Sequence, residues 1–407
     1  MQNLMKASVT DLAILGGAPA FTTPLHVGRP NIGDRTALLA RINDILDRRW
    51  LTNNGCYVQE FEQRLSDLTG VRHCIAMANG TVALEIAIRA LNLTGEVIVP
   101  SMTFVATAHA LQWQQIRPVF CDVDPHTCTM DPARVAELIT PRTTGILGVH
   151  LWGRVCEVER LSEIAIEHGL KLLFDAAHAF HTSYQGRMVG GFGDAEVFSF
   201  HATKFFNTFE GGAVATNDDD LAAKIRLMKN FGFSGYDNVI HIGTNGKMPE
   251  ISAAMGLTGL DSLDDFVATN RRNYHHYQCE LDGLPGIRLW RYDETGHSNY
   301  QYIVLDIDET AAGFSRDGLA AILWAENVLA RRYFYPGCHA MEPYRTLYPD
   351  SAARLPVTES LVKRTLVLPN GTAIAPDEID EVCAIIRFAL EQSDEIKALM
   401  AREVAYA

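Results

Sequence analysis

The 407-residue sequence predicts an α/β fold built on a mixed, mostly parallel β-sheet flanked by helices. Short apolar runs alternate with helical stretches between Cys74 and about Thr216, which is the pattern of parallel strands joined by helical crossovers. The composition is 47% hydrophobic and 21% charged, as is ordinary for a globular α/β enzyme with a sizeable core. The runs expected as strands are 97–100, 118–121, 145–150, 172–175, 197–200 and 212–216.

The segment before the sheet is expected to contain an arm and two helices. Residues 1–35 show little apolar periodicity and predict an extended N-terminal arm. A helical pattern runs from Thr36 toward Arg49, and a polar turn follows at 50–55. A second helical pattern ends at Gly70, where glycine suits a C-cap. Its apolar residues recur at intervals of three and four: Val58, Phe61, Leu65 and Leu68.

The segment after the sheet is expected to form a smaller C-terminal α+β domain. Three aspartates at 218–220 resemble the acidic first turn of a helix that reaches Asn230. The glycine-rich loop 231–246 is long enough to predict a functional or partner-contacting role. Beyond it, the pattern predicts helices at 261–280, 316–326 and 377–392 and a strand at 302–306. We therefore divide the chain into an arm (1–35), a large α/β domain (36–256) and a smaller domain (257–407).

Charge and cysteine usage narrow the classes of function. The formal net charge of −14, without a Lys/Arg cluster, argues against binding to a nucleic-acid backbone. The eight cysteines form no C-x-x-C pair and no secretory signal precedes them, so we expect reduced thiols in a cytoplasmic protein. Apolar stretches fall short of the roughly 18 residues that a membrane helix needs. His and Cys lack zinc-type spacing, so no metal site is predicted.

Two segments near the start of the sheet are candidates for binding a planar, phosphorylated cofactor. Gly80 and Thr81 follow an apolar run and open an alanine-rich helical pattern, so their N–H groups would form an anion site at a helix N-terminus. A plain N-cap is the alternative. Phe104 follows the apolar run that ends at Pro100, where a ligand of an open α/β sheet lies, and its ring could stack on a cofactor or belong to the core.

Polar residues stand at or just beyond the ends of the two predicted strands 172–175 and 197–200. Asp175 closes the apolar strand 172–175 and would be the partner of a protonated ring nitrogen, or else an N-cap or salt-bridge group. Ser199 and Lys204 end and follow the strand 197–200. A lysine held there could form an imine with an aldehyde cofactor. His178 could contact the same cofactor or be a satisfied histidine. Jointly, these residues predict a pyridoxal phosphate site at one edge of the sheet.

At these residues the chain resembles the DegT/DnrJ/StrS group of nucleotide-sugar aminotransferases, from about residue 35 to residue 390. The resemblance implies the type I fold of pyridoxal phosphate enzymes, which is that of aspartate aminotransferase. The motifs that carry it are Leu51–Gly55, Asn79–Thr81, Val99–Phe104, Asp175–Ala179, Ser199–Lys204, Glu210–Gly212 and Asn230–Gly232.

The resemblance implies a role for each candidate residue. Lys204 would be the imine lysine and proton shuttle, Asp175 the partner of the pyridine nitrogen, and Phe104 the stacking ring. The phosphate would be held by Gly80, Thr81 and Ser199. The family completes this phosphate site with an asparagine of the neighbouring subunit, and Asn245 matches it, which implies a homodimer with shared active sites.

The resemblance also implies the reaction. An amino group would pass from L-glutamate, through the pyridoxamine form of the cofactor, to a nucleotide-activated 4-keto-6-deoxyhexose of a natural-product (antibiotic) deoxysugar pathway. We expect dTDP-4-keto-6-deoxyglucose as the acceptor. Candidate substrate contacts are Thr52, Asn53, Asn54, Arg331, Tyr333 and His339. For each, a solvated polar turn, a surface charge or a core aromatic is the alternative.

Two positions depart from the commonest family pattern. His178 stands where many members carry glutamine, although histidine occurs among enzymes that aminate carbon 4. The loop motif reads Asn245-Gly-Lys-Met248, whereas many members have Asn-Tyr-Arg-Met. A 3-aminotransferase, a sugar dehydratase or lyase, and a non-catalytic regulatory homologue remain alternatives. Lys204 argues against the dehydratases, which carry histidine at its position.

Overall fold

The computed structural model of the chain describes residues 6–406, so the first five residues of the predicted arm and the final residue of the predicted C-terminal domain lie outside it. Its centre is a seven-stranded sheet in which β10 is antiparallel to both neighbours and all other neighbouring strands are parallel. The mixed, mostly parallel sheet predicted from the sequence is thereby confirmed. In spatial order, the strands are β2 (His73–Met77), β10 (Gly212–Thr216), β9 (Ala195–Ser199), β6 (Lys171–Asp175), β5 (Thr143–Val149), β3 (Glu96–Pro100) and β4 (Arg117–Cys121).

Helices cover both faces of this sheet because its strands are apolar on both sides. Within β2, for example, Cys74 and Ala76 face one core cluster, and Ile75 and Met77 face the other. The first cluster lies under α2 (Cys56–Thr69), α6 (Val158–His168) and α8 (Glu250–Asp261), and the second lies under α3 (Gly80–Ala90), α4 (Val105–Gln112) and α7 (Asp219–Met228). A short helix α5 (Pro132–Leu138) and a two-residue hairpin of β7 (Ser183–Tyr184) and β8 (Arg187–Met188) complete this part.

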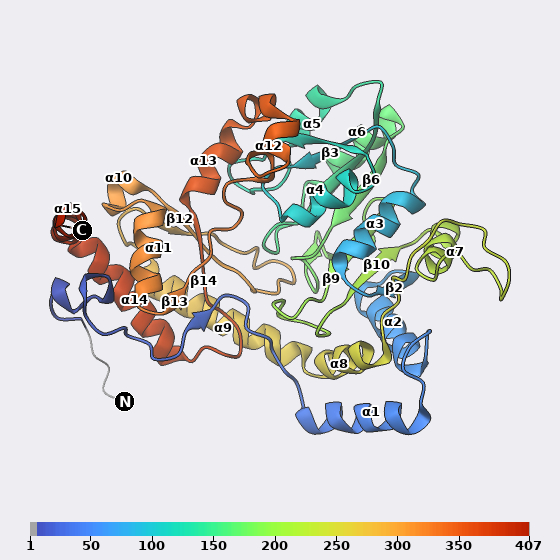
Figure 1. Cartoon of the computed structure of the whole chain (residues 1–407), viewed down its shortest axis with the longest axis horizontal. Helices are drawn as coiled ribbons and strands as arrows, with labels where there is room; N and C mark the ends of the chain where they lie inside the picture. Colours follow the sequence, from blue (N-terminus) through green and yellow to red (C-terminus); the bar gives the residue numbers. More distant parts are fainter. Residues whose placement is uncertain (1–5, 407) are drawn as a thin grey trace.

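The C-terminal part has a core cluster of its own around a three-stranded antiparallel sheet. Its order is β11 (Ile287–Leu289), β12 (Ile303–Ile307) and β14 (Thr365–Leu368). The helix α9 (Leu263–Leu281) leads into it from α8 (Figure 1). The remaining elements are α10 (Glu309–Ala312), α11 (Arg316–Ala325), β13 (Val328–Leu329), α12 (Tyr344–Leu347), α13 (Pro356–Arg364), α14 (Pro376–Glu391) and α15 (Ser393–Tyr406). The exact domain limits stay a prediction.

The N-terminal arm is more structured than its lack of periodicity predicts. It holds two 3-10 turns (Val9–Asp11 and Ala13–Leu15) and a short strand, β1 (Leu25–His26), which pairs in parallel with β13. The buried carboxylate of Glu326 accepts hydrogen bonds from backbone N–H groups of the arm and pairs with Lys6. Long-range contacts of this kind leave no local pattern, which is why the sequence does not reveal them. The arm then passes to α1 (Arg35–Arg48).

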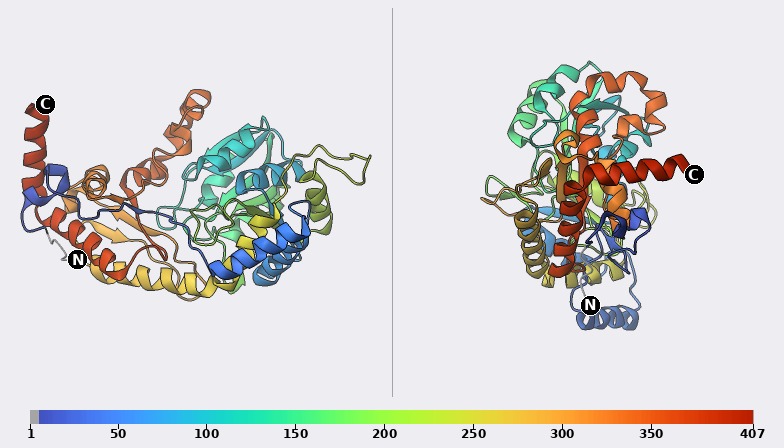
Figure 2. Two further views of the ribbon diagram at one scale, coloured as in Figure 1. Left: turned by 60° about the horizontal axis from the view of Figure 1, so that its bottom comes forward. Right: turned by 90° about the vertical axis from the view of Figure 1, so that its left-hand side faces the viewer.

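The loop 231–246 projects beyond α7, at the end of the molecule opposite α15 (Figure 2). Its apolar side chains Tyr236, Ile240 and Ile242 are exposed. None of the helices in the described part of the chain combines the length and apolar character that a membrane crossing requires. All eight cysteines are free thiols.

Candidate active site at the carboxyl edge of the sheet

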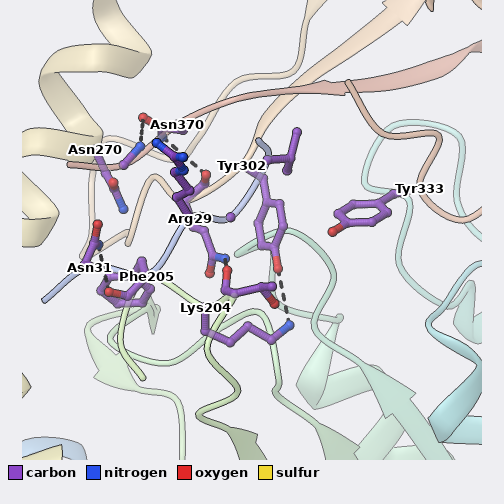
Figure 3. Close-up of a pocket in the computed structure, with 13 residues that line it drawn as sticks. Arg29, Asn31, Lys204, Phe205, Asn270, Tyr302, Tyr333 and Asn370 are labelled. Carbon is purple, nitrogen blue, oxygen red and sulfur yellow. Dashed lines mark hydrogen bonds between the residues drawn. The ribbon is translucent and has the colours of Figure 1, made fainter. Parts of the chain in front are cut away.

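Lys204 lies in the turn that follows β9. Its backbone N–H donates a hydrogen bond to the carbonyl of His201, which closes the turn. The residue is half-buried, and Nζ donates a hydrogen bond of 3.4 Å to the hydroxyl of Tyr302 (Figure 3). Burial disfavours the ammonium form and lowers the pKa of Lys204 to about 8, against an opposing effect of the nearby Asp175. A lysine in this setting is partly neutral near physiological pH and can act as a nucleophile or base.

Asp175 ends β6, the strand beside β9, and is only 6% exposed. One carboxylate oxygen accepts a hydrogen bond of 2.8 Å from the hydroxyl of Thr107, and the other accepts one of 3.0 Å from the N–H of Ala177. Burial raises the pKa of Asp175, whereas these two hydrogen bonds and the charge of Lys204 favour its ionised form. The carboxylate is therefore held in one orientation, and a cationic partner would stabilise its charge.

His178 lies three residues beyond Asp175 and is 8% exposed. Its Nδ1 accepts a hydrogen bond of 3.4 Å from the N–H of Trp152. Its ring lies 4.5 Å from that of Tyr302 and stacks at 5.8 Å on that of Phe334. Burial, and secondly the charge of Lys204, lower the pKa of His178 well below its usual value, so the imidazole is neutral. A neutral ring of this kind can contact a flat ligand or accept and donate single hydrogen bonds.

The N-terminus of α3 meets the end of β9 in a close approach that requires glycine. A Cβ atom on Gly80 would lie 3.0 Å from Cβ of Ser199, and one on Gly212 of β10 would lie 2.7 Å from the backbone of Asn79 and Gly80. Asn79 caps the helix by accepting from the N–H of Val82. A helix leaves the N–H groups of Gly80 and Thr81 without an internal acceptor, and a Cβ atom on Gly80 would also lie 3.3 Å from Oγ of Ser199. A helix N-terminus of this kind can bind an anion.

Phe104 is the residue before α4, and its ring is 58% exposed. The ring centroid lies 6.3 Å from that of Phe334, which also stacks on His178. An exposed aromatic ring at this edge is available to cover a flat ligand. The structure thus brings together most of the residues that the sequence predicts as catalytic or cofactor-binding, although their individual roles stay predictions.

The predicted residues Asn53, Asn54 and Asn245 lie apart from Lys204 in this chain. Asn53 and Asn54 line a hollow beside Lys247, while Asn245 is exposed and forms a backbone bridge to Asn230. Thr52 is exposed in the same turn as the two asparagines.

The candidate substrate contacts near the C-terminal sheet, Arg331, Tyr333 and His339, differ in their exposure and partners. Tyr333 lines the pocket at Lys204, and the exposed Arg331 lies over its ring at 5.5 Å. His339, in contrast, is 3% exposed, and its two ring nitrogens are bonded to Ser101 at 2.6 Å and to Glu359 at 2.8 Å. Both ring nitrogens thus have partners within the chain, and the side chain ties the segment 338–340 to the end of β3, while a substrate contact of His339 stays a prediction.

The sequence did not single out Thr107, Tyr302 or the pair His150–Glu196, although all lie close to the site. His150 and Glu196 are buried and joined at 2.8 Å. Against the lowering effect of burial, hydrogen bonds with Cys156 and with Glu196 raise the pKa of His150 to about 9, and Nδ1 of the ring accepts a hydrogen bond of 3.2 Å from the backbone N–H of Cys156. No local motif marks these side chains, because each acts on a strand distant in sequence.

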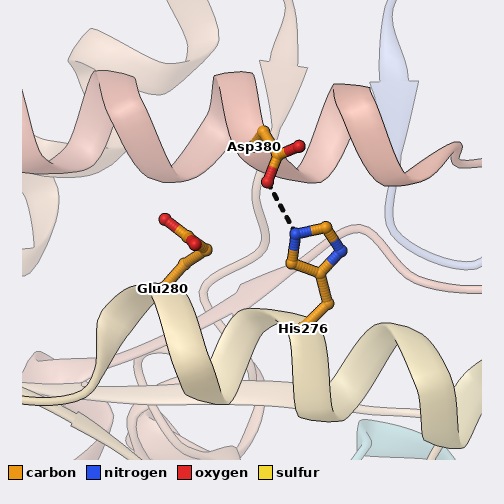
Figure 4. Close-up of side chains that lie close together, drawn as sticks. All are labelled: His276, Glu280 and Asp380. Carbon is orange, nitrogen blue, oxygen red and sulfur yellow. Dashed lines mark hydrogen bonds and ion pairs between the residues drawn. The ribbon is translucent and has the colours of Figure 1, made fainter.

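A separate cluster of His276, Glu280 and Asp380 joins α9 to α14 (Figure 4). His276 bonds to Asp380 at 2.6 Å, and Glu280 forms an ion pair of 2.9 Å with Arg387. Because Arg387 already neutralises Glu280, the cluster is explained as an interhelical salt-bridge network.

Comparison with known proteins identifies the family. Residues 34–387 match the DegT/DnrJ/EryC1/StrS aminotransferase family, and the chain belongs to this family. The dTDP-4-amino-4,6-dideoxy-D-glucose transaminase of Shigella dysenteriae is 36% identical over 372 residues, or 89% of this chain and 98% of its own. A GDP-perosamine synthase of Caulobacter vibrioides is 35% identical over 84% of this chain and 92% of its own.

The structure of DesI in the presence of its TDP-sugar product is similar throughout. It has 49% sequence identity and a TM-score of 0.91, over 96% of this chain and 99% of its own. The family membership and the aminotransferase fold expected from the sequence are thereby confirmed.

The depressed pKa of Lys204 predicts an unusual pH dependence for its reaction with aldehydes. In the cofactor-free protein, formaldehyde and a reducing agent should methylate Lys204 with a half-maximal rate at about pH 8, because only the neutral amine attacks. An ordinary lysine has a pKa of about 10.4 and would reach its half-maximal rate only at that pH. Mass spectrometry of the Lys204 peptide measures this rate.

Asp175→Asn supplies the matched variant. Asp175 raises the pKa of Lys204, so its neutralisation should move the midpoint to lower pH. A midpoint near pH 10 in the wild-type protein, or no downward movement in the variant, would show that Lys204 is not held in this environment.

Proposed function

We propose that this chain transfers an amino group from L-glutamate to the 4-keto carbon of dTDP-4-keto-6-deoxyglucose, giving dTDP-4-amino-4,6-dideoxyglucose, with pyridoxal phosphate as cofactor. The observation that carries the proposal is the half-buried Lys204 beside Asp175, in a chain of an aminotransferase family. The acceptor is supported by the relatives, because one is named as a dTDP-4-amino-4,6-dideoxy-D-glucose transaminase and another was crystallised with a TDP-sugar.

The residues at the sheet edge fit pyridoxal phosphate by their chemistry. The N-terminus of α3 at Gly80 and Thr81, with Ser199 close by, suits a phosphate group. Asp175 is a buried carboxylate suited to a pyridinium N–H, and the exposed ring of Phe104 can cover a pyridine face. When bound, the cofactor supplies an electron sink and carries the amino group between the two substrates.

The protein's own part in the reaction is proton transfer, orientation and charge stabilisation. Lys204 acts as the base that removes the proton from the α-carbon of glutamate and as the acid that returns a proton on the acceptor side. Asp175 holds the proton on the ring nitrogen, and Thr107 holds Asp175 in place. Because Asp175 is buried, its charge interacts more strongly than it would at a surface. Neutral His178 orients the ring without adding charge.

We further propose that the enzyme works as a homodimer. Asn245 is exposed near the end of the projecting loop, and the same loop presents apolar side chains to the outside. A second copy covering this region would bring Asn245 to the proposed phosphate site of its partner. The turn that contains Thr52, Asn53 and Asn54 borders the hollow beside Lys247 and would face the same second copy. The cytoplasmic location stays a prediction.

Lys204→Ala should remove turnover. Loss of the base and the covalent attachment point should lower the rate of sugar amination with L-glutamate by more than about 10⁴-fold, to background. The assay separates sugar nucleotides by chromatography and identifies the product by mass. Lys397→Ala, which removes an exposed lysine on α15, is the control and should retain full activity.

Two outcomes of this assay would contradict the proposal. Amination by the Lys204→Ala variant at a substantial rate, without an added amine, would exclude Lys204 as the catalytic lysine. A wild-type protein that removes a hydroxyl group from the sugar without consuming glutamate would indicate a dehydratase.

Gly80→Ala should weaken cofactor binding. The new methyl group would press on Ser199 at 3.0 Å and displace either the helix N-terminus or the hydroxyl, and we expect an approximately 10-fold or greater rise in the dissociation constant for pyridoxal phosphate. Equilibrium dialysis of the cofactor measures this. Lys397→Ala, at an exposed position of α15, is the control. Unchanged affinity in the Gly80 variant would place the phosphate elsewhere.

A further inference from the structure

A small polar pocket of about 30 Å³ opens beside Lys204. In Figure 3, Asn270 and Asn370 lie on one side and Tyr302 and Tyr333 on the other, with Lys204 below them and its amine directed at the Tyr302 hydroxyl. The thirteen residues that line the pocket include Lys204 and Arg29 but no aspartate or glutamate. Although the chain as a whole carries a formal charge of −14, this pocket is therefore cationic and suits an anionic ligand.

Arg29 comes from the N-terminal arm, in the turn after β1 that the pairing of β1 with β13 holds in place. Within residues 6–406, no carboxylate lies within ion-pair distance of its guanidinium, whereas Arg41 on the neighbouring helix α1 is paired with Asp261. An unpaired guanidinium at the mouth of a pocket without carboxylates can bind the two oxygens of a carboxylate side by side.

Asn270 provides an independent sign that the pocket takes a ligand. It is 1% exposed, and its Nδ2 donates to the carbonyl of Asn299 at 2.9 Å, but its buried Oδ1 has no donor in the described chain. A buried amide oxygen without a partner costs stability. Arg29, with five N–H donors, can turn inward and donate to Oδ1 and to a bound carboxylate at the same time.

The position of Lys204 selects between the anionic groups of the two substrates. The α-carboxylate of glutamate is attached to the carbon that carries the reacting amine, so it must lie within a few Å of Lys204 when that amine reacts. The diphosphate of a sugar nucleotide is attached to carbon 1, across the hexose ring from the reacting carbon 4. A cationic pocket that includes Lys204 itself therefore fits the carboxylate of the amino donor.

We propose that Arg29 binds the α-carboxylate of the amino donor in this pocket, with Asn270 as the acceptor that holds the guanidinium inward. This inference rests on the proposed function. It adds a determinant of donor specificity that lies in the N-terminal arm, outside the motifs around the cofactor site.

The test separates the two halves of the reaction in the cofactor-loaded protein. Arg29→Gln should raise the apparent dissociation constant for L-glutamate by roughly 10- to 100-fold, because one charged hydrogen-bonding partner is lost. The loss of visible absorbance as glutamate converts the cofactor to its amine form measures this constant. The second half, started from the amine form with the keto sugar nucleotide, should keep its wild-type dissociation constant for the sugar.

Binding without turnover gives a second readout. Calorimetric titration with glutarate, a dicarboxylate without an amine, should show the same weakening in Arg29→Gln and a partial recovery in Arg29→Lys. Arg35→Gln removes an exposed guanidinium six residues further along the same segment and should change none of these values.

Two results would overturn the assignment. If Arg29→Gln weakens only the binding of the sugar nucleotide in the second half, the pocket holds the diphosphate. If it changes the dissociation constant in neither half, Arg29 is a surface cation. Failure of the proposed function looks different, because the wild-type protein itself would then not respond to glutamate or would leave the sugar unchanged.

Discussion

The placement of Lys204 beside Asp175 is the constraint on which the rest of the site depends. A lysine that is to act as a base near neutral pH must be moved out of water, and burial lowers its pKa to about 8. The same burial raises the pKa of Asp175, so the carboxylate needs the hydrogen bonds from Thr107 and Ala177 to remain ionised.

The sheet makes this arrangement possible because it brings several chain segments to one edge. β6 and β9 are parallel neighbours, so their carboxyl ends place Asp175 and Ser199 side by side. The antiparallel strand β10 then runs back against the start of α3, where Gly212 allows backbone to lie against backbone. The start of α3 and the lysine are thus positioned by neighbouring strands of one sheet, and the C-terminal part contributes Tyr302 and Tyr333 to the pocket.

The sequence predicted the central sheet and the position of Asp175 and Ser199 at its edge, for a physical reason. Strands buried on both faces are continuous apolar runs, and polar residues that end them stand out, as Asp175 and Ser199 do. The predicted helix 261–280 matches α9, whereas α8 was not predicted, because it is buried nearly all round and shows no amphipathic pattern. Local signals also did not reveal the partners of His339, because Ser101 and Glu359 lie on other elements.

The residues that the sequence missed act across long separations. Thr107 bonds to Asp175 over 68 residues and Lys204 to Tyr302 over 98, and neither contact leaves a periodic or spaced motif. Arg29 reaches the pocket only because β1 pairs with β13. Such contacts follow from the tertiary fold and not from local propensity. The residues proposed to bind the amino donor could therefore be identified only from the structure.

The most direct test of the account follows the nitrogen atom itself. The protein, loaded with pyridoxal phosphate, is incubated with ¹⁵N-labelled L-glutamate and dTDP-4-keto-6-deoxyglucose, and the sugar is examined by NMR. The account predicts ¹⁵N bonded to carbon 4, with one 2-oxoglutarate formed for each amine. A label on carbon 3, or a changed sugar without ¹⁵N, would contradict it.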